Sequence, residues 1–324
     1  MKNKAINFFK AILLPLIFYV FFGIASKGRF FSSSIIPAVL QQTVFPAIVA
    51  LAIFNINELE LWDLCSGAIL ITSSIVGGNV AKNNEFGLAG MILCVLLVSV
   101  TMCLIVGVVK YFTKIPSMVA TFGMVMVFES VGAVLFNGEF SAPRAWTIFN
   151  RTPTCYILLA LCLLLVYVQT NYTTFGYNVR ALGHGTETAI NIGVNVRNTL
   201  MKTYIFQGVL LTVAALVYIS MKGSASMHMN FGTTSIGFNA IVAVLIGKSL
   251  AAYCSPLFGT IIGAFTLSLL SAGLISLGVE TTWQKVANGI FLIAFLAFFE
   301  NQKRVSDARA RKEKAKELMQ QISE

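Results

Sequence analysis

Long apolar runs, separated by short stretches of charged or turn-forming residues, repeat along the whole chain. Ten such runs fall at about 8–25, 36–54, 62–80, 86–109, 116–137, 154–170, 200–221, 236–253, 257–275 and 283–299. Each is close to the roughly 20 residues that an α-helix needs to cross a bilayer. The pattern predicts an all-α polytopic membrane protein with about ten transmembrane helices, which together form one transmembrane domain over residues 1–302.

Composition agrees with this pattern and excludes several classes of protein. Hydrophobic residues make up 57% of the 324 residues and charged residues only 11%, with a mean hydropathy of +0.81. Soluble domains carry about a quarter charged residues, so a soluble enzyme, a disordered chain and a fibrous protein are excluded. Lys2, Lys4 and Lys10 come before the apolar core of the first run, as in a signal peptide, but residues 23–26 (GIAS) form a poor cleavage site. We therefore expect this run to remain as the first helix.

The distribution of positive charge predicts the orientation in the membrane. If ten helices cross, both termini lie on one side, and that side receives 16 of the 23 Lys and Arg residues. Cytoplasmic segments are the ones enriched in Lys and Arg, so we expect the N- and C-termini to be cytoplasmic. Seven of these 16 positive residues lie in the last 22 residues, so the assignment of the cytoplasmic side depends largely on the C-terminal tail.

Three segments are too long or too polar to be simple turns. Residues 138–153 contain two prolines and a tryptophan, and we expect them outside as a partly ordered external loop. Residues 171–199 form the longest polar segment between apolar runs and are expected on the cytoplasmic side. Residues 303–324 carry seven positive and four negative side chains, which predicts a charged cytoplasmic tail, either a short helix or a frayed end.

Residue types that bind metals or carry catalysis are too few or too scattered for an enzyme. The six cysteines lie in apolar stretches without C-x-x-C spacing, and the only two histidines, His184 and His228, are too far apart to form a His-x-x-x-His pair. We expect no catalytic residue, no metal and no cofactor in this chain. The net charge of +10 follows from the positive-inside rule, so nucleic acid is not an expected partner.

Gly247-Lys248-Ser249 resembles the end of a phosphate-binding loop. That loop needs a glycine five residues before its second glycine, and Val242 occupies this position. Lys248 is better interpreted as a helix end whose long side chain reaches the cytoplasmic membrane surface. We therefore expect no ATP site in this chain.

Polar side chains inside the apolar runs are candidates for a solute path. Glu129 lies near the middle of its run, where a carboxylate costs about 2.5–3.5 kcal/mol and needs a partner or a wet cavity. Two interpretations stay open, a residue of the solute path and a structural hydrogen bond to a neighbouring helix. Some of the other polar residues within the runs should line a passage, and the candidates are Thr121, Asn239, Ser268 and Ser271.

The 171–199 segment carries a short helix signal. Thr186 is suited to cap a helix start, and Gly193 is suited to end it. The apolar side of this helix, Ala189 with Ile192, would fit a partner's groove, with Glu187 beside it. The alternative is an ordinary helix at the membrane surface without a partner.

At this segment the chain resembles the permease subunits of ribose-type ATP-binding-cassette sugar importers. Residues 176–183 (GYNVRALG), with Glu187, Ala189 and 193–196 (GVNV), are similar to that family's cytoplasmic loop. Three further blocks agree in order, namely 63–68 (DLCSGA), 114–123 (KIPSMVATFG) and the glycine-rich pattern of the last two runs from 259 to 286. Two departures stand out: Glu129 replaces what is usually an Arg, and Lys248 with 251–254 (AAYC) replaces a glycine-rich loop.

The resemblance implies the partners and the mechanism. Two permease subunits, identical or paralogous, would enclose a path through the lipid bilayer of a bacterial cytoplasmic membrane. A separate ATPase subunit, which uses ATP and Mg, would dock beneath them, and an extracytoplasmic binding protein would deliver a monosaccharide or a similar small polar solute. The residues expected to couple to the ATPase are Gly183, Glu187, Ala189, Ile192 and Gly193.

Other transport classes fit the residues less well. Paired acidic residues within the membrane would indicate a secondary transporter, and a repeated filter-like segment would indicate a channel. The sequence has one intramembrane acid and no such repeat. Within the importer class, nucleosides, a signalling furanose or branched-chain amino acids are alternative solutes.

Overall fold

The computed structural model describes residues 2–113 and 115–280, and residues 283, 284, 286, 287, 289–291, 293–295 and 297. Its longer helices are α1 (Lys2–Ala25), α2 (Ile35–Glu58), α3 (Ser66–Asn83), α4 (Gly87–Thr113), α5 (Ser117–Val134), α6 (Thr154–Tyr172), α7 (Thr174–His184), α9 (Val196–Lys222), α10 (Thr234–Ser249) and α11 (Pro256–Ser276). The short elements are α8 (Thr186–Asn191), the 3-10 turns η1 (Arg29–Phe31), η2 (Leu135–Gly138), η3 (Arg144–Trp146) and η4 (Leu250–Ala252), and the strands β1 (Glu139–Ser141) and β2 (Ser224–Ser226).

The predicted helical membrane architecture is confirmed. Among the described residues, six helices are long and apolar enough to cross a membrane: α2, α4, α5 with η2, α6, α9 and α11. Two shorter apolar helices, Leu13–Ala25 within α1 and Thr234–Ser249, accompany them. The last predicted run, 283–299, is described only in part, and the predicted tail 303–324 lies outside the described residues.

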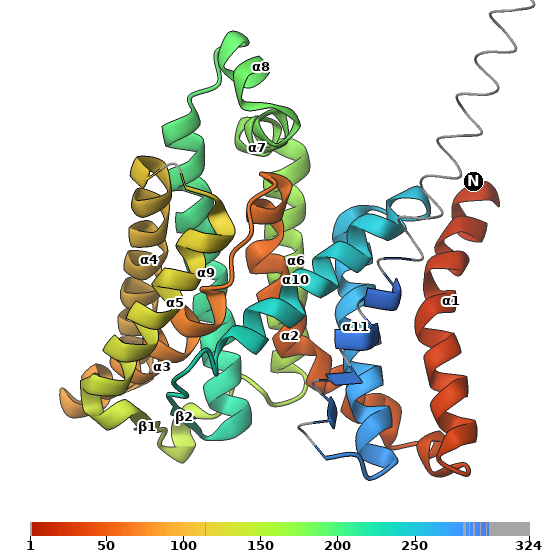
Figure 1. The fold of residues 1–324 in the computed structure, drawn as a ribbon. Coiled ribbons are helices and arrows are strands. Elements are labelled where there is room, and N and C mark those ends of the chain that lie inside the picture. Colours follow the sequence, from red (N-terminus) through yellow and green to blue (C-terminus); the bar gives the residue numbers. More distant parts are fainter. Residues whose placement is uncertain are drawn as a thin grey trace, which may run out of the picture.

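Helix α2 lies at the centre of the bundle. Its residues 47–52 are fully buried and apolar on every side, which is the pattern of a helix surrounded by protein. It packs against α6, α9, α10 and α11, and its C-terminal end meets α7. Figure 1 shows α1 at the edge of the molecule, beside α11. There the ring of Phe18 meets Phe291 edge to face at 5.1 Å.

Helices α10 and α11 approach each other through glycines. A Cβ on Gly259 would lie 2.7 Å from the carbonyl oxygen of Gly247, and a Cβ on Gly247 would overlap the backbone of Thr260. Small residues at such positions let two helix backbones touch, as is common inside membranes. The pair therefore packs backbone against backbone near the end of α10.

The segment 138–153 contains a strand, which the all-α prediction missed. β1 pairs antiparallel with β2, with Phe140 opposite Ala225. The N–H of Met227 extends the contact by donating to the carbonyl oxygen of Gly138 at 2.8 Å. Two connecting segments that are far apart in the sequence are thereby joined at one end of the molecule, opposite to α7 and α8 (Figure 1).

Candidate functional site

The segment 171–199 contains two helices at the end of the molecule that also holds the N-terminal end of α1 (Figure 1). Sequence analysis predicted α8 but missed α7. The hydroxyl of Thr173 caps α7 by accepting the N–H of Gly176 at 3.2 Å. The chain then turns at Gly185, whose φ is +155°, and α8 begins at once.

The two ends of α8 differ from the prediction in one respect. Gly185, and not Thr186, is the N-cap residue, and no side chain caps this end. Gly193 does end the turn, as predicted, with φ +86°. Its N–H donates to the carbonyl oxygen of Ile190 at 2.9 Å, and the next N–H, of Val194, donates to Ala189 at 3.0 Å. These bonds satisfy carbonyl groups that the helix end leaves free.

The apolar face of α8 is not the predicted one. Ala189 is completely buried in its own chain, where α8 packs on α7 and α9, so its methyl group is not available to a partner. The exposed apolar side chains are Ile190 and Ile192, which are 54% and 69% exposed, and Glu187 is exposed near them. The burial of Ala189 contradicts its predicted contact with a partner, while a partner contact of Ile192 stays a prediction.

Gly183, which is among the residues expected to couple to the ATPase, makes a close contact within its own chain. It lies inside α7, and a Cβ at this position would overlap the carbonyl oxygen of Glu58 at the end of α2. The sharp turn falls two residues later, at Gly185. Gly183 therefore allows the backbone of α7 to rest directly on the C-terminal end of the central helix.

Lys248 meets the same end of α2. Its ammonium group donates to the carbonyl oxygen of Asn57 at 2.7 Å and lies 3.4 Å from Oε1 of Glu58. This is the one ion pair formed within the part of the chain that the structure describes. The negative end of the α2 dipole attracts this cation. The position of Lys248 at the cytoplasmic membrane surface stays a prediction.

Glu129 faces the interior of the bundle and is only 2% exposed. Its Oε2 accepts the N–H of Phe231 at 2.9 Å. Its Oε1 accepts both the N–H and the hydroxyl of Thr233, at 3.0 Å and 2.6 Å. These three donors immediately precede α10, where the positive end of the helix dipole stabilises a carboxylate. The geometry favours the structural interpretation of Glu129.

The other candidate path residues do not join Glu129 in a shared network of hydrogen bonds. The hydroxyl of Thr121 donates within α5, to Met118 at 3.1 Å, and that of Ser268 donates within α11, to Ala264 at 3.0 Å. Asn239 and Ser271 are half-buried on α10 and α11. Whether any of these four residues lines a passage stays a prediction.

Two buried polar pairs were missed by sequence analysis. The carboxylate of Asp63 accepts hydrogen bonds from the side-chain amide of Gln207 in α9 and, at 2.8 Å, from the N–H of Cys65. The side-chain amide of Asn55 donates to Gln169 at 2.8 Å. A polar side chain within or beside an apolar run was the available signal, but its partner lies more than a hundred residues away in each case.

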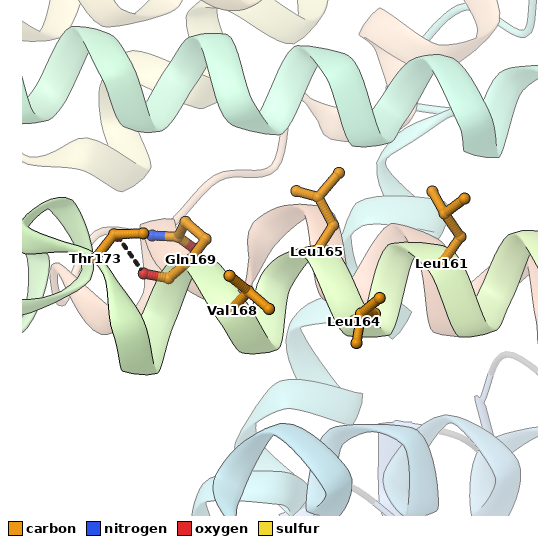
Figure 2. Close-up of a pocket in the computed structure, with 6 residues that line it drawn as sticks. All are labelled: Leu161, Leu164, Leu165, Val168, Gln169 and Thr173. Carbon is orange, nitrogen blue, oxygen red and sulfur yellow. Dashed lines mark hydrogen bonds between the residues drawn. The ribbon is translucent and has the colours of Figure 1, made fainter.

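A groove runs along the outer face of α6 (Figure 2). Its volume is about 430 Å³, and it is lined by Leu161, Leu164, Leu165, Val168, Gln169 and Thr173. The hydroxyl of Thr173 is already bonded to the carbonyl group of Gln169, as the dashed line shows. A sugar needs several polar partners, so this apolar groove is typical of a lipid-facing surface and not of a sugar site.

Comparison with known proteins decides the family. Residues 35–296, about four fifths of the chain, match the family described as the permease component of branched-chain amino acid transport systems. The chain belongs to this permease family. The match includes every helix from α2 to α11, and with them the segment 171–199 and Glu129.

Named relatives of the permease point to sugar import. It is 24% identical over 324 residues to the galactose/methyl galactoside import permease of Haemophilus influenzae, covering 91% of this chain and 96% of that protein. It is 25% identical over 278 residues to the ribose import permease of Escherichia coli K12, covering 82% and 85%. A third relative, 27% identical over 298 residues, is the autoinducer 2 import permease of Photorhabdus luminescens, with 88% and 85% covered. The resemblance to simple-sugar importer permeases is therefore confirmed.

Proposed function

We propose that this permease forms the translocation path for a monosaccharide or a similar small polar solute. The observation that carries the proposal is the family match over 35–296 together with relatives named for galactose and ribose import. A separate ATPase supplies the energy, an extracytoplasmic binding protein delivers the solute, and a second permease completes the path. The relative named for autoinducer 2 makes a signalling solute the second candidate. Nucleosides and branched-chain amino acids are not favoured by the relatives' names.

The permease performs no bond chemistry in this proposal. It binds no cofactor, and ATP and Mg are used by the partner ATPase. Its contribution is a two-state change between outward-open and inward-open forms, which the ATPase cycle biases. The test is uptake of radiolabelled ribose and galactose into proteoliposomes that hold the permease, its ATPase and its binding protein. Uptake that continues without ATP would contradict the proposal and favour a secondary transporter.

The proposed topology has ten crossings in a bacterial cytoplasmic membrane, with both termini inside. Residues 171–199 form the cytoplasmic coupling segment, 138–153 the external loop and 303–324 the cytoplasmic tail of a single membrane domain, 1–302. The charge distribution supports this arrangement. It is also supported by the position of α7 and α8, which share one end of the molecule with the start of α1, while β1 and β2 lie at the other end (Figure 1).

Cysteine labelling tests the topology. On a background without the six natural cysteines, Ala310→Cys should be protected from an impermeant thiol reagent in intact cells. Ala145→Cys, at an exposed position of the external loop, should react within minutes and serves as the control. Rapid labelling at position 310 together with protection at position 145 would show that the protein has the opposite orientation in the membrane.

The coupling segment makes a second prediction. Ile192→Arg places a charge on the exposed apolar surface of α8 and should weaken ATPase docking by about 2 kcal/mol, or roughly thirtyfold in affinity. Co-purification of the ATPase with each variant measures this. Thr113→Arg adds the same charge at the exposed C-terminal end of α4, outside the coupling segment, and should leave docking unchanged. Normal docking of Ile192→Arg would show that α8 is an ordinary surface helix.

A further inference from the structure

Helix α10 is held at both ends by charged side chains that bind across to other elements. It is 16 residues long, so it spans about 24 Å. At its last turn, Lys248 contacts the end of α2, and just before its first turn Glu129 of α5 binds the backbone. One helix thus connects the end of the molecule that carries α7 and α8 with the end that carries β1 and β2.

At the inner end, α7 and α10 contact the same residue. The backbone of Glu58 lies directly against Gly183 of α7, and its carboxylate pairs with Lys248 of α10. The Lys248 ammonium group also holds the adjacent carbonyl oxygen of Asn57. Contacts from α7 and from α10 therefore meet at Glu58.

At the outer end, α10 is continuous with the paired strands. Glu129 fixes Phe231 and Thr233, and only a few residues earlier Met227 and β2 are bonded to Gly138 and β1. The two external segments, 138–153 and 223–233, are thus attached to the first turn of α10. Close packing makes such an arrangement move as a unit between discrete positions, because packed interiors do not deform continuously.

Resting on the proposed function, we propose that α10 transmits movement of the coupling segment, 171–199, to the external segments 138–153 and 223–233. In this proposal Lys248 and Glu58 are positioning residues for coupled transport. The two side chains of the pair are 33% and 21% exposed, and a partly exposed ion pair contributes little to stability. The pair sits where the coupling segment and α10 both meet α2, and its main effect is on the coupling between ATP hydrolysis and uptake.

The experiment compares four variants in proteoliposomes with the ATPase and the binding protein. Lys248→Met and Glu58→Gln should lower the amount of solute imported per ATP about fivefold or more. ATPase co-purification and melting temperature should stay at the wild-type level. Lys248→Arg, which keeps the charge and the donors, should preserve the coupling ratio. Lys202→Met makes the same change at an exposed lysine of α9 and is the matched control.

The outcomes separate this inference from the proposed function. A wild type without solute-stimulated ATP hydrolysis overturns both. If the wild type is coupled normally and Lys248→Met and Glu58→Gln import as much solute per ATP as it does, only the inference about α10 is overturned. The same holds if Lys202→Met lowers the solute imported per ATP as much as Lys248→Met does. If Lys248→Met fails to assemble, Glu58→Gln decides, because it retains the bond from Lys248 to Asn57.

Discussion

Glu129→Leu is expected to destabilise the permease by about 3–5 kcal/mol, because it leaves three donors without their acceptor at a nearly closed site. The affected donors are the N–H groups of Phe231 and Thr233 and the Thr233 hydroxyl. Solute uptake should fall as well, since the start of α10 loses its attachment. The loss of the monodisperse protein on heating in detergent measures the first effect, and uptake in proteoliposomes measures the second.

Two variants control this prediction. Glu129→Gln keeps one acceptor oxygen but turns an NH₂ group toward a donor, so it should keep the fold at a cost of about 1–2 kcal/mol and alter transport. Ser130→Leu changes the exposed neighbour on the same helix and should stay within about 0.5 kcal/mol of wild type. A Leu variant at position 129 with wild-type melting and uptake would mean that the carboxylate has no energetic role.

The second large effect is expected for Gly183→Ala. The new Cβ would overlap a backbone oxygen at the end of α2, which no side-chain movement can relieve, so α7 must shift away from Glu58. We expect solute-stimulated ATP hydrolysis to fall about tenfold or more while the protein still inserts. The readout is ATP turnover with and without the loaded binding protein.

Gly123→Ala is the matched control for this substitution. It makes the same change in α5, where a Cβ would meet no atom within 4 Å and the backbone φ is not positive. A helix-interior Gly→Ala change at such a place should be neutral or stabilise by about 0.5–1 kcal/mol. Equal ATP turnover in the two variants would show that α7 does not rest on α2 in the working complex.

The membrane-spanning helices were predictable because the bilayer allows few alternatives. A spanning segment must satisfy its own backbone and cover it with apolar side chains, so long apolar runs become helices. The strands β1 and β2 gave no comparable signal, since each has three residues and its partner lies about 85 positions away. Helix α7 was missed because Gly176 and Gly183 are weak helix formers, and a single sequence does not show that they permit close backbone contact.

The candidate site was predicted in kind but not in detail. A lone intramembrane carboxylate had to find donors, and Glu129 does, but a single sequence does not reveal that the donors are more than a hundred residues away. Whether Ala189 or Ile190 is exposed depends on the rotation of α8 about its own axis relative to α7. A helix of six residues has too few positions for its hydrophobic periodicity to determine that rotation.

The bond between Asp63 and Gln207 also sets an order of events during synthesis. Asp63 leaves the ribosome 144 residues ahead of its partner. At about 5–20 residues per second, this interval lasts roughly 7–30 s. During that time the connection between α2 and α3 carries a carboxylate whose partner helix has not yet been made. A chain truncated before α9 would therefore keep this carboxylate without its amide partner.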